Sequence, residues 1–113
     1  STVRESLARK FLFILEEKAF FSGAFRSDDH NSLKEHDFEL ILQFYNSLIA
    51  RKASRPLDEE LQFQLEMYCR GSVYMTVKWV LGGMKDSPWQ MADKLVDAMP
   101  PKLSEVFDHL GLL

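Results

Sequence analysis

Histidine and carboxylate residues that could bind a metal ion gather in one polar stretch of this sequence. Asp28, Asp29 and His30 lie in it, and His36 and Asp37 follow closely. Two histidines that share a metal on one helix face are normally one helical turn apart, and His30 and His36 do not have this spacing. We therefore interpret the stretch as a solvated loop, and we expect neither a metal nor another cofactor.

No other residues form a catalytic pattern. Cys69 lies beside an apolar helix face with no histidine paired to it, so we predict a buried small side chain rather than a nucleophile. His109 is isolated. The sequence contains no Ser-His-Asp order, glycine-rich phosphate loop or paired-carboxylate arrangement. We expect that the chain is not an enzyme.

A set of large apolar and aromatic residues could face a common interior. The set consists of Phe11, Leu15, Phe44, Tyr45, Met67, Tyr68 and Met75. Such residues usually form a packed core, and the alternative is the lining of an apolar pocket. Arg70 and Tyr68 are candidates for the polar end of such a pocket. For Arg70, a salt bridge with a nearby carboxylate is the favoured alternative.

Helical periodicity positions these residues. Apolar residues recur at steps of three and four, no segment alternates with period two, and the four prolines lie between the periodic segments. We predict an all-α bundle of four to five helices. The predicted segments are 3–21, 32–51, 57–81 and 88–99, with a last short helix near 103–110.

Capping residues predict several helix ends. Ser32 with Glu35, and Ser87 with Gln90, match capping boxes, and Pro88 occupies a favoured first helical position. Gly23 is a predicted stop for the first helix, and Gly82-Gly83 ends the third.

The third predicted helix changes character along its length. Up to Glu66 it has one apolar face, but beyond Met67 it is apolar nearly all round. It is either a core helix that its own chain covers or part of a dimer interface, and we favour the interface because a small bundle covers few faces of one helix. The predicted interface residues are Gly71, Tyr74, Val77, Leu81, Trp89, Leu95 and Met99. Gly71 would permit close approach of another helix.

Bulk composition narrows the class of protein. The 113 residues suit a single domain, 1–113, and 46% hydrophobic content supports a real core. The chain has a net charge of −3, whereas a nucleic-acid-binding surface needs a concentration of basic residues, so we do not expect this chain to bind nucleic acid by itself. The single cysteine fits a reducing cytosol, and the chain shows neither a signal peptide nor an apolar run long enough to span a bilayer, so we expect a cytoplasmic protein.

The stretch from Tyr68 to Met99 resembles the C-terminal domain of TetR/AcrR-type transcriptional regulators, in the version common in Firmicutes. The shared residues are Tyr68 and Gly71, Trp79, Gly83, Ser87-Pro88 and Met91-Ala92. The spacing of the preceding helices is also similar, whereas Arg70 departs from the small or apolar residue usual before this glycine.

The resemblance implies an all-helical regulatory domain. Its last two long helices would pair with those of a partner subunit as a four-helix bundle, giving a homodimer. A pocket would hold a small hydrophobic or aromatic effector, and DNA would be bound only through an N-terminal helix-turn-helix domain that is absent from this sequence. The alternative is a stand-alone helical protein–protein interaction module without a small-molecule ligand.

Overall fold

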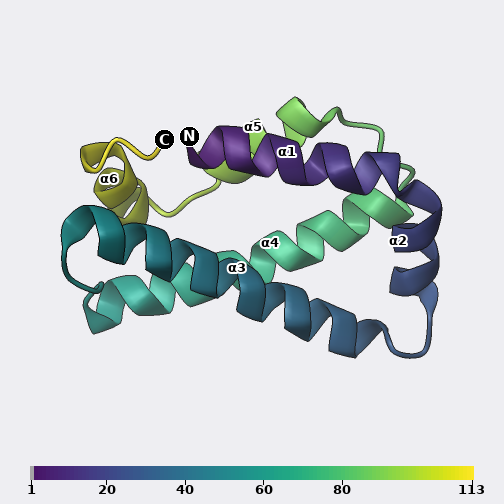
Figure 1. Ribbon diagram of the computed structural model, residues 1–113, viewed down its shortest axis with the longest axis horizontal. Helices are drawn as coiled ribbons and strands as arrows, with labels where there is room; N and C mark the ends of the chain where they lie inside the picture. The colour runs from purple at the N-terminus through teal and green to yellow at the C-terminus, as the bar shows by residue number, and fades with distance from the viewer. Residues whose placement is uncertain (1) are drawn as a thin grey trace.

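The computed structural model describes residues 2–113, and over this range the chain is helical with no strand (Figure 1). The helices are α1 (Val3–Glu16), α2 (Lys18–Arg26), α3 (His30–Ala53), α4 (Glu59–Leu81), α5 (Pro88–Asp97) and α6 (Pro101–His109). The predicted all-α bundle is confirmed.

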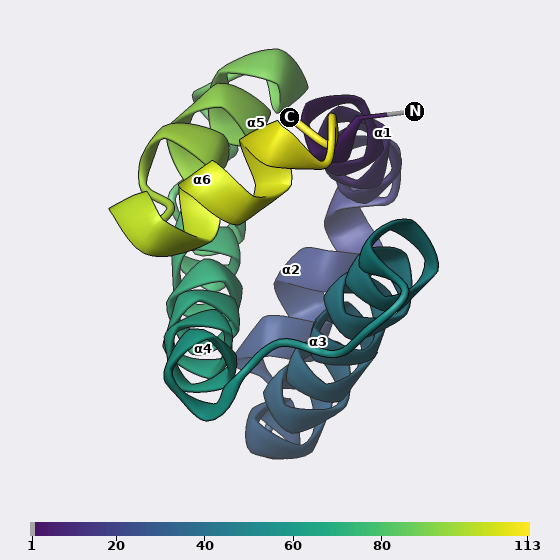
Figure 2. The same cartoon turned by 90° about the vertical axis from the view of Figure 1, so that its left-hand side faces the viewer.

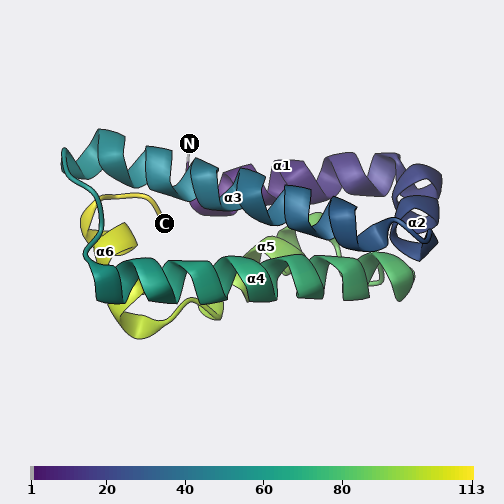
Figure 3. The same cartoon turned by 90° about the horizontal axis from the view of Figure 1, so that it is seen from below.

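The helices form a bundle around a central space that side chains fill. α1 packs mainly against α5, and α3 packs against α4, with α2 contacting both α3 and α4. Viewed along the long axis of the bundle, α4 and α3 lie on opposite sides of the molecule (Figure 2). Helices α1, α5 and α6 lie across the top of this view (Figure 2). From below, α3 and α4 run the length of the molecule in two neighbouring layers (Figure 3).

The two ends of the chain lie together. The backbone N–H of Val3 donates to the carbonyl of Leu112 at 2.7 Å, and both side chains are buried. Gly111 makes the necessary reversal with a φ of 71°, which a residue without a Cβ adopts readily. The C-terminal tail thereby covers the start of α1.

α4 is the most deeply embedded helix. Its buried residues are Leu65, Tyr68, Cys69, Ser72, Val73, Thr76, Val77, Trp79 and Val80. Asp58 caps its start by accepting from the N–H of Leu61 at 2.9 Å. Neither α4 nor any other helix within residues 2–113 has the length and apolar character that crossing a bilayer requires.

The helix ends that were predicted from strong local signals are confirmed. The Ser87 side chain accepts from the N–H of Gln90, the Gln90 side chain accepts from the N–H of Ser87, and Pro88 is the first residue of α5. α4 ends at the glycine pair. Gly83 has a φ of 95°, and the N–H of the next residue, Met84, reaches back to the carbonyl of Trp79 at 2.9 Å.

The first predicted helix is divided in two, which raises the helix count above the predicted five. Glu17 leaves helical geometry, with φ −106° and ψ 37°, and α2 starts at the next residue. Gly23 does not end a helix but lies inside α2, where glycine is tolerated at a cost of about 1 kcal/mol. The change of direction allows Phe25 to reach the core, so tertiary packing overrides the local stop signal.

The predicted start of the second segment is also wrong. α3 begins at His30, and its N-cap is Asp29, whose side chain makes no capping hydrogen bond. Ser32 therefore lies within the first turn of α3 and caps nothing. His36 and Asp37 lie in α3, within the predicted segment 32–51, whereas His30 is helical rather than part of the polar loop. Asp37 contributes to the pocket below.

Candidate functional site

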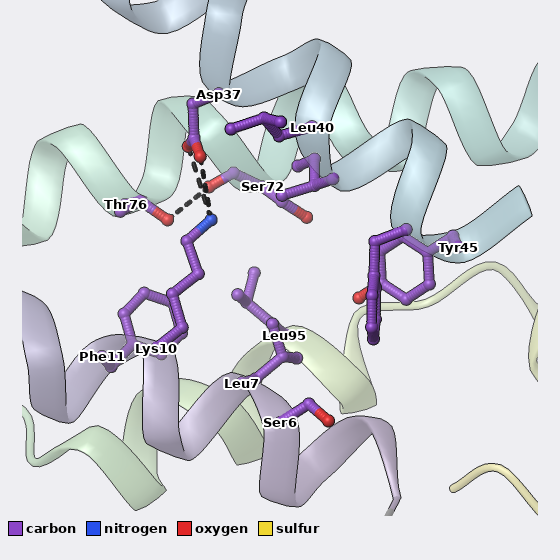
Figure 4. A pocket seen from close by; sticks show the side chains of 12 residues that line it. Ser6, Leu7, Lys10, Phe11, Asp37, Leu40, Tyr45, Ser72, Thr76 and Leu95 are labelled. Atoms are coloured by element: carbon purple, nitrogen blue, oxygen red, sulfur yellow. Dashed lines mark hydrogen bonds and ion pairs between the residues drawn. The ribbon is translucent and has the colours of Figure 1, made fainter. Parts of the chain in front are cut away.

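A pocket of about 260 Å³ lies between α1, α3, α4 and α5 (Figure 4). Its lining residues are Ser6, Leu7, Lys10, Phe11, Asp37, Leu40, Ile41, Phe44, Tyr45, Ser72, Thr76 and Leu95. Most of this wall is aliphatic or aromatic. A partly enclosed apolar hollow with a few polar groups is the usual form of a small-molecule site.

Helix packing creates this space. α1 lies on α5 while α3 lies on α4, so the inner faces of α1 and α3 meet across the hollow. Phe11 and Tyr45 are buried in its walls, whereas Leu40 and Phe44 are exposed at its edge. The pocket is therefore closed at its base and reaches the surface beside α3.

One ion pair crosses the pocket wall. The Lys10 side chain extends from α1 towards Asp37 on α3, with its Nζ atom 3.1 Å from Oδ1 and 3.5 Å from Oδ2 (Figure 4). The two side chains are only 31% and 21% exposed. By contrast, the partners of the surface pair Lys102–Glu60 are 65% and 63% exposed. Lys10 and Asp37 therefore place paired charges beside an apolar cavity.

Two hydroxyl groups from α4 complete the polar side of the pocket. Ser72 donates to the carbonyl of Tyr68 at 2.7 Å, and Thr76 donates to the carbonyl of Ser72 at 2.8 Å. Both protons are thus used within α4, a local bonding pattern common for serine and threonine in helices. Towards the pocket these hydroxyls can offer lone pairs to a donor.

The predicted pocket residues are only partly brought together. Phe11, Phe44 and Tyr45 line the pocket. Leu15, Met67, Tyr68, Arg70 and Met75 lie outside its lining. The main reason is the rotation of α4, which turns Ser72 and Thr76, rather than the larger Met67 and Met75, towards α1 and α3.

Arg70 forms a salt bridge with a nearby carboxylate, which is the alternative that the sequence analysis favoured. Its guanidinium contacts the Glu35 carboxylate at 2.6 and 3.3 Å and lies 3.6 Å from the centre of the Phe38 ring. Hydrogen bonding to Arg70 lowers the pKa of Glu35. The pair lies on the surface and links α3 to α4, away from the pocket.

Tyr68 and Cys69 are core residues of α4. The Tyr68 hydroxyl donates to the carbonyl of Leu95, and its ring lies 6.2 Å from that of Tyr45. Burial raises the pKa of both tyrosines. Burial also raises the pKa of the Cys69 thiol to about 12. Cys69 is a buried free thiol, as the sequence indicated, and the raised pKa favours its protonated form.

The pocket residues that the sequence did not assign are mostly polar or small. They are Ser6, Leu7, Lys10, Asp37, Leu40, Ile41, Ser72 and Thr76, and Leu95 was assigned to the interface instead. Leu7 and Ile41 could have been found, because they belong to the apolar stripes of their helices. The Lys10–Asp37 pair has no local signal, since the two residues are distant in sequence and meet only in the fold.

The predicted interface residues divide into two groups. Gly71, Tyr74, Leu81 and Trp89 are exposed, and Tyr74 reaches 69%. Val77, Leu95 and Met99 are buried within the chain itself. All three belong to the core of the chain: Val77 lies on the buried side of α4, Leu95 lies on α5, which packs against α1, and Met99 follows α5.

An exposed apolar stripe nevertheless follows α4. Phe63, Met67, Tyr74 and Leu81 recur at steps of four and seven residues and are all exposed. Residues with this spacing lie on one face of a helix. We call these four residues the α4 stripe.

Gly71 lies beside the α4 stripe in open space. Apart from its chain neighbours and the adjoining backbone of α4, a Cβ atom built at this position meets no described atom within 4 Å. The close helix approach that the sequence suggested therefore does not occur inside the monomer. Only a second molecule could provide it.

No group of three or more metal-binding side chains occurs within residues 2–113. His30 instead uses its Nδ1 atom in a 2.9 Å contact with the carbonyl of Ser27, at the turn before α3.

Comparison with known proteins gives the class. A family model described as a transcriptional regulator C-terminal region, of the TetR type, matches residues 1–100. No curated protein and no solved structure matches the chain. The chain belongs to the family of TetR-type C-terminal regulatory domains.

Proposed function

We propose that this chain is the effector-binding and dimerisation domain of a TetR-type transcriptional regulator. The observation that carries the proposal is the apolar pocket of about 260 Å³ between four helices, in a chain whose family is regulatory. A small hydrophobic or aromatic effector would enter beside α3 and replace water against Phe11, Tyr45 and Leu95. We further infer the version of the family common in Firmicutes, on the residues shared between Tyr68 and Met99, and a cytoplasmic location, where bacterial DNA lies.

The effector would act by preferring one arrangement of the helices. A ligand shifts a conformational equilibrium only as far as its affinity differs between the two states. Because the pocket wall combines α1 with α3, α4 and α5, filling it would bias how α1 sits on the other helices. DNA binding would belong to a helix-turn-helix domain outside this sequence.

A homodimer is the second part of the proposal. The α4 stripe supports it, since four large apolar side chains exposed on one helix face are typical of a surface that another protein covers. Trp89 on α5 is a further exposed aromatic residue. In a dimer the α4 helices would pair through the stripe, with α5 alongside, and the buried Val77, Leu95 and Met99 would support that surface from within.

The alternative function is a helical protein–protein interaction module without a small ligand. The same α4 stripe favours it, because a protein contact needs no pocket. The two functions differ in what the pocket binds.

Two measurements test the proposal. Light scattering at tens of micromolar should give a dimer, and Leu81→Glu or Tyr74→Glu should give monomers, because a carboxylate in the stripe cannot be buried unpaired. Phe20→Glu, which alters an exposed aromatic residue of α2, should leave the dimer intact. A monomeric wild-type protein at this concentration would contradict the proposed homodimer.

Calorimetric titration with butylbenzene tests the pocket. Binding that is abolished by Thr76→Phe, which fills the pocket from α4, would support effector binding. A dimer that binds no apolar compound would instead be the interaction module.

A further inference from the structure

The geometry points to a specific class of effector: an uncharged molecule with an apolar body and a hydroxyl head that hydrogen-bonds to Lys10 and Asp37 together. This inference rests on the proposed function, because it concerns the chemistry of the same pocket. It is carried by the ion pair in the pocket wall and by the apolar character of the remaining lining.

The ion pair has hydrogen-bonding capacity left over. Lysine carries three N–H donors and a carboxylate offers about four acceptor positions, and their mutual contact at 3.1 and 3.5 Å uses only part of both. A hydroxyl group is both a donor and an acceptor. It can therefore accept from Lys10 and donate to Asp37 without separating them.

A charged head group fits this site less well. A ligand carboxylate would be attracted to Lys10 but would lie against the Asp37 carboxylate, which repels it. A ligand ammonium group would be attracted to Asp37 but repelled by the Lys10 ammonium. Either ligand would bring a like charge against one member of an ion pair whose side chains are less than one third exposed. Like charges at short range repel each other, and partial burial weakens the screening by solvent.

Most of the lining away from the ion pair is apolar, with the hydroxyl-bearing Ser6 and Tyr45 as the exceptions (Figure 4). In Figure 4, Lys10, Asp37, Ser72 and Thr76 lie towards one side, and Tyr45 stands well apart from the Lys10 ammonium. The hydroxyl protons of Ser72 and Thr76 are bound within α4, so these side chains offer only acceptor lone pairs. The neutral head would lie at this side, and the body would extend along the apolar wall.

A matched series of compounds tests the inference by isothermal titration calorimetry on the full chain. Phenylbutanol, butylbenzene, phenylbutyrate and phenylbutylammonium share one apolar body and differ in the head. We expect phenylbutanol to bind about tenfold or more tightly than the other three, since hydrogen bonds to charged groups are among the stronger ones.

Variants of the pair should change the order of affinities. Lys10→Met leaves an unpaired carboxylate and should make phenylbutylammonium the tightest ligand, whereas Asp37→Asn leaves an unpaired ammonium and should favour phenylbutyrate. The double variant Lys10→Met/Asp37→Leu should bring phenylbutanol and butylbenzene to within about threefold of each other. Circular dichroism of each variant establishes that it is folded.

The outcomes separate the inference from the proposed function. If butylbenzene binds the wild type as tightly as phenylbutanol, or if a charged compound binds it most tightly, the inference is overturned and the pocket remains a binding site. If none of the four compounds binds, the proposed effector function is overturned together with the inference. Preference for phenylbutanol that survives in the double variant would also contradict the role of the pair.

Discussion

The hydroxyl of Tyr68 donates a hydrogen bond to the backbone carbonyl of Leu95, so a side chain of α4 completes the C-terminal end of α5. The last carbonyls of a helix lack partners within the helix. Here the N–H of Met99 bonds to Val96 at 3.2 Å and leaves the Leu95 carbonyl to Tyr68. Because the Leu95 side chain lines the pocket, the same contact holds one pocket wall in place.

Tyr68→Phe should lower the free energy of unfolding by about 1–3 kcal/mol, because it leaves a buried carbonyl without a donor. Urea unfolding followed by circular dichroism measures the change. Tyr74→Phe is the matched control, since Tyr74 is exposed in the single chain. When both substitutions are made in the monomeric Leu81→Glu background, Tyr74→Phe should stay within about 0.5 kcal/mol of its parent. Equal effects of the two substitutions would show that the buried contact is not stabilising.

Ser87→Ala should lower the free energy of unfolding by about 1 kcal/mol, the usual loss for an N-cap side chain. Ser32→Ala should change it by less than about 0.5 kcal/mol, because Ser32 lies inside α3 and caps nothing. Thermal and urea unfolding of both variants provide the comparison. A large effect at Ser32 would mean that α3 begins where the capping pattern placed it.

These two serines show what local sequence can and cannot predict. Both precede a matching side chain at the correct spacing, but only Ser87 is followed by proline and preceded by a glycine break. The start of α3 is set instead by the turn before His30, where His30 contacts the carbonyl of Ser27 through both its backbone N–H and its ring. A two-residue capping pattern does not by itself determine where a helix begins when the contacts around it favour another first residue.

Helical periodicity likewise predicted the fold better than the site. The apolar positions of α4 were identified correctly, but which of its faces remain exposed depends on where α1, α3 and α5 lie. Val77 became core while Met67 and Tyr74 stayed outside. The pocket was harder to predict than the exposed faces of α4, because Lys10 and Asp37 come from helices that are distant in sequence.

Gly71→Ala should stabilise a monomeric background such as Leu81→Glu by about 1 kcal/mol, because alanine favours helix and the added Cβ meets no atom of another helix. In the otherwise wild-type chain the same change should weaken the dimer, if a partner helix passes close to this position. Sedimentation equilibrium measures the association.

Gly23→Ala is the control for Gly71→Ala, since Gly23 is also helical and a Cβ added there would also be free of contacts. It should add stability without altering association. Unchanged self-association of the Gly71→Ala protein would place the dimer contact on another surface.

The stability of the fold should fall as the pH rises above about 9. The Cys69 pKa is near 9 in the unfolded chain and about 12 in the folded chain, so above pH 9 the unfolded state loses its proton first. The loss approaches about 1.4 kcal/mol for each pH unit between these values. The raised pKa values of Tyr45 and Tyr68 act in the same direction at higher pH.

Urea unfolding between about pH 7 and about pH 11 would measure this dependence. Cys69→Ala should flatten the first part of the decline, although its stability at neutral pH will be lower because of the cavity left in the core. A wild-type protein whose stability stays constant over this range would contradict the burial of these groups.

Chemical-shift mapping on the isotope-labelled chain is the sharpest test of the effector pocket, since it locates a bound molecule rather than merely detecting one. With phenylbutanol as the probe, we expect the largest amide shifts on α1, α3, α4 and α5 around Lys10, Ile41, Thr76 and Leu95. Shifts confined to the α4 stripe, or no shifts at saturating phenylbutanol, would contradict a pocket that binds an effector.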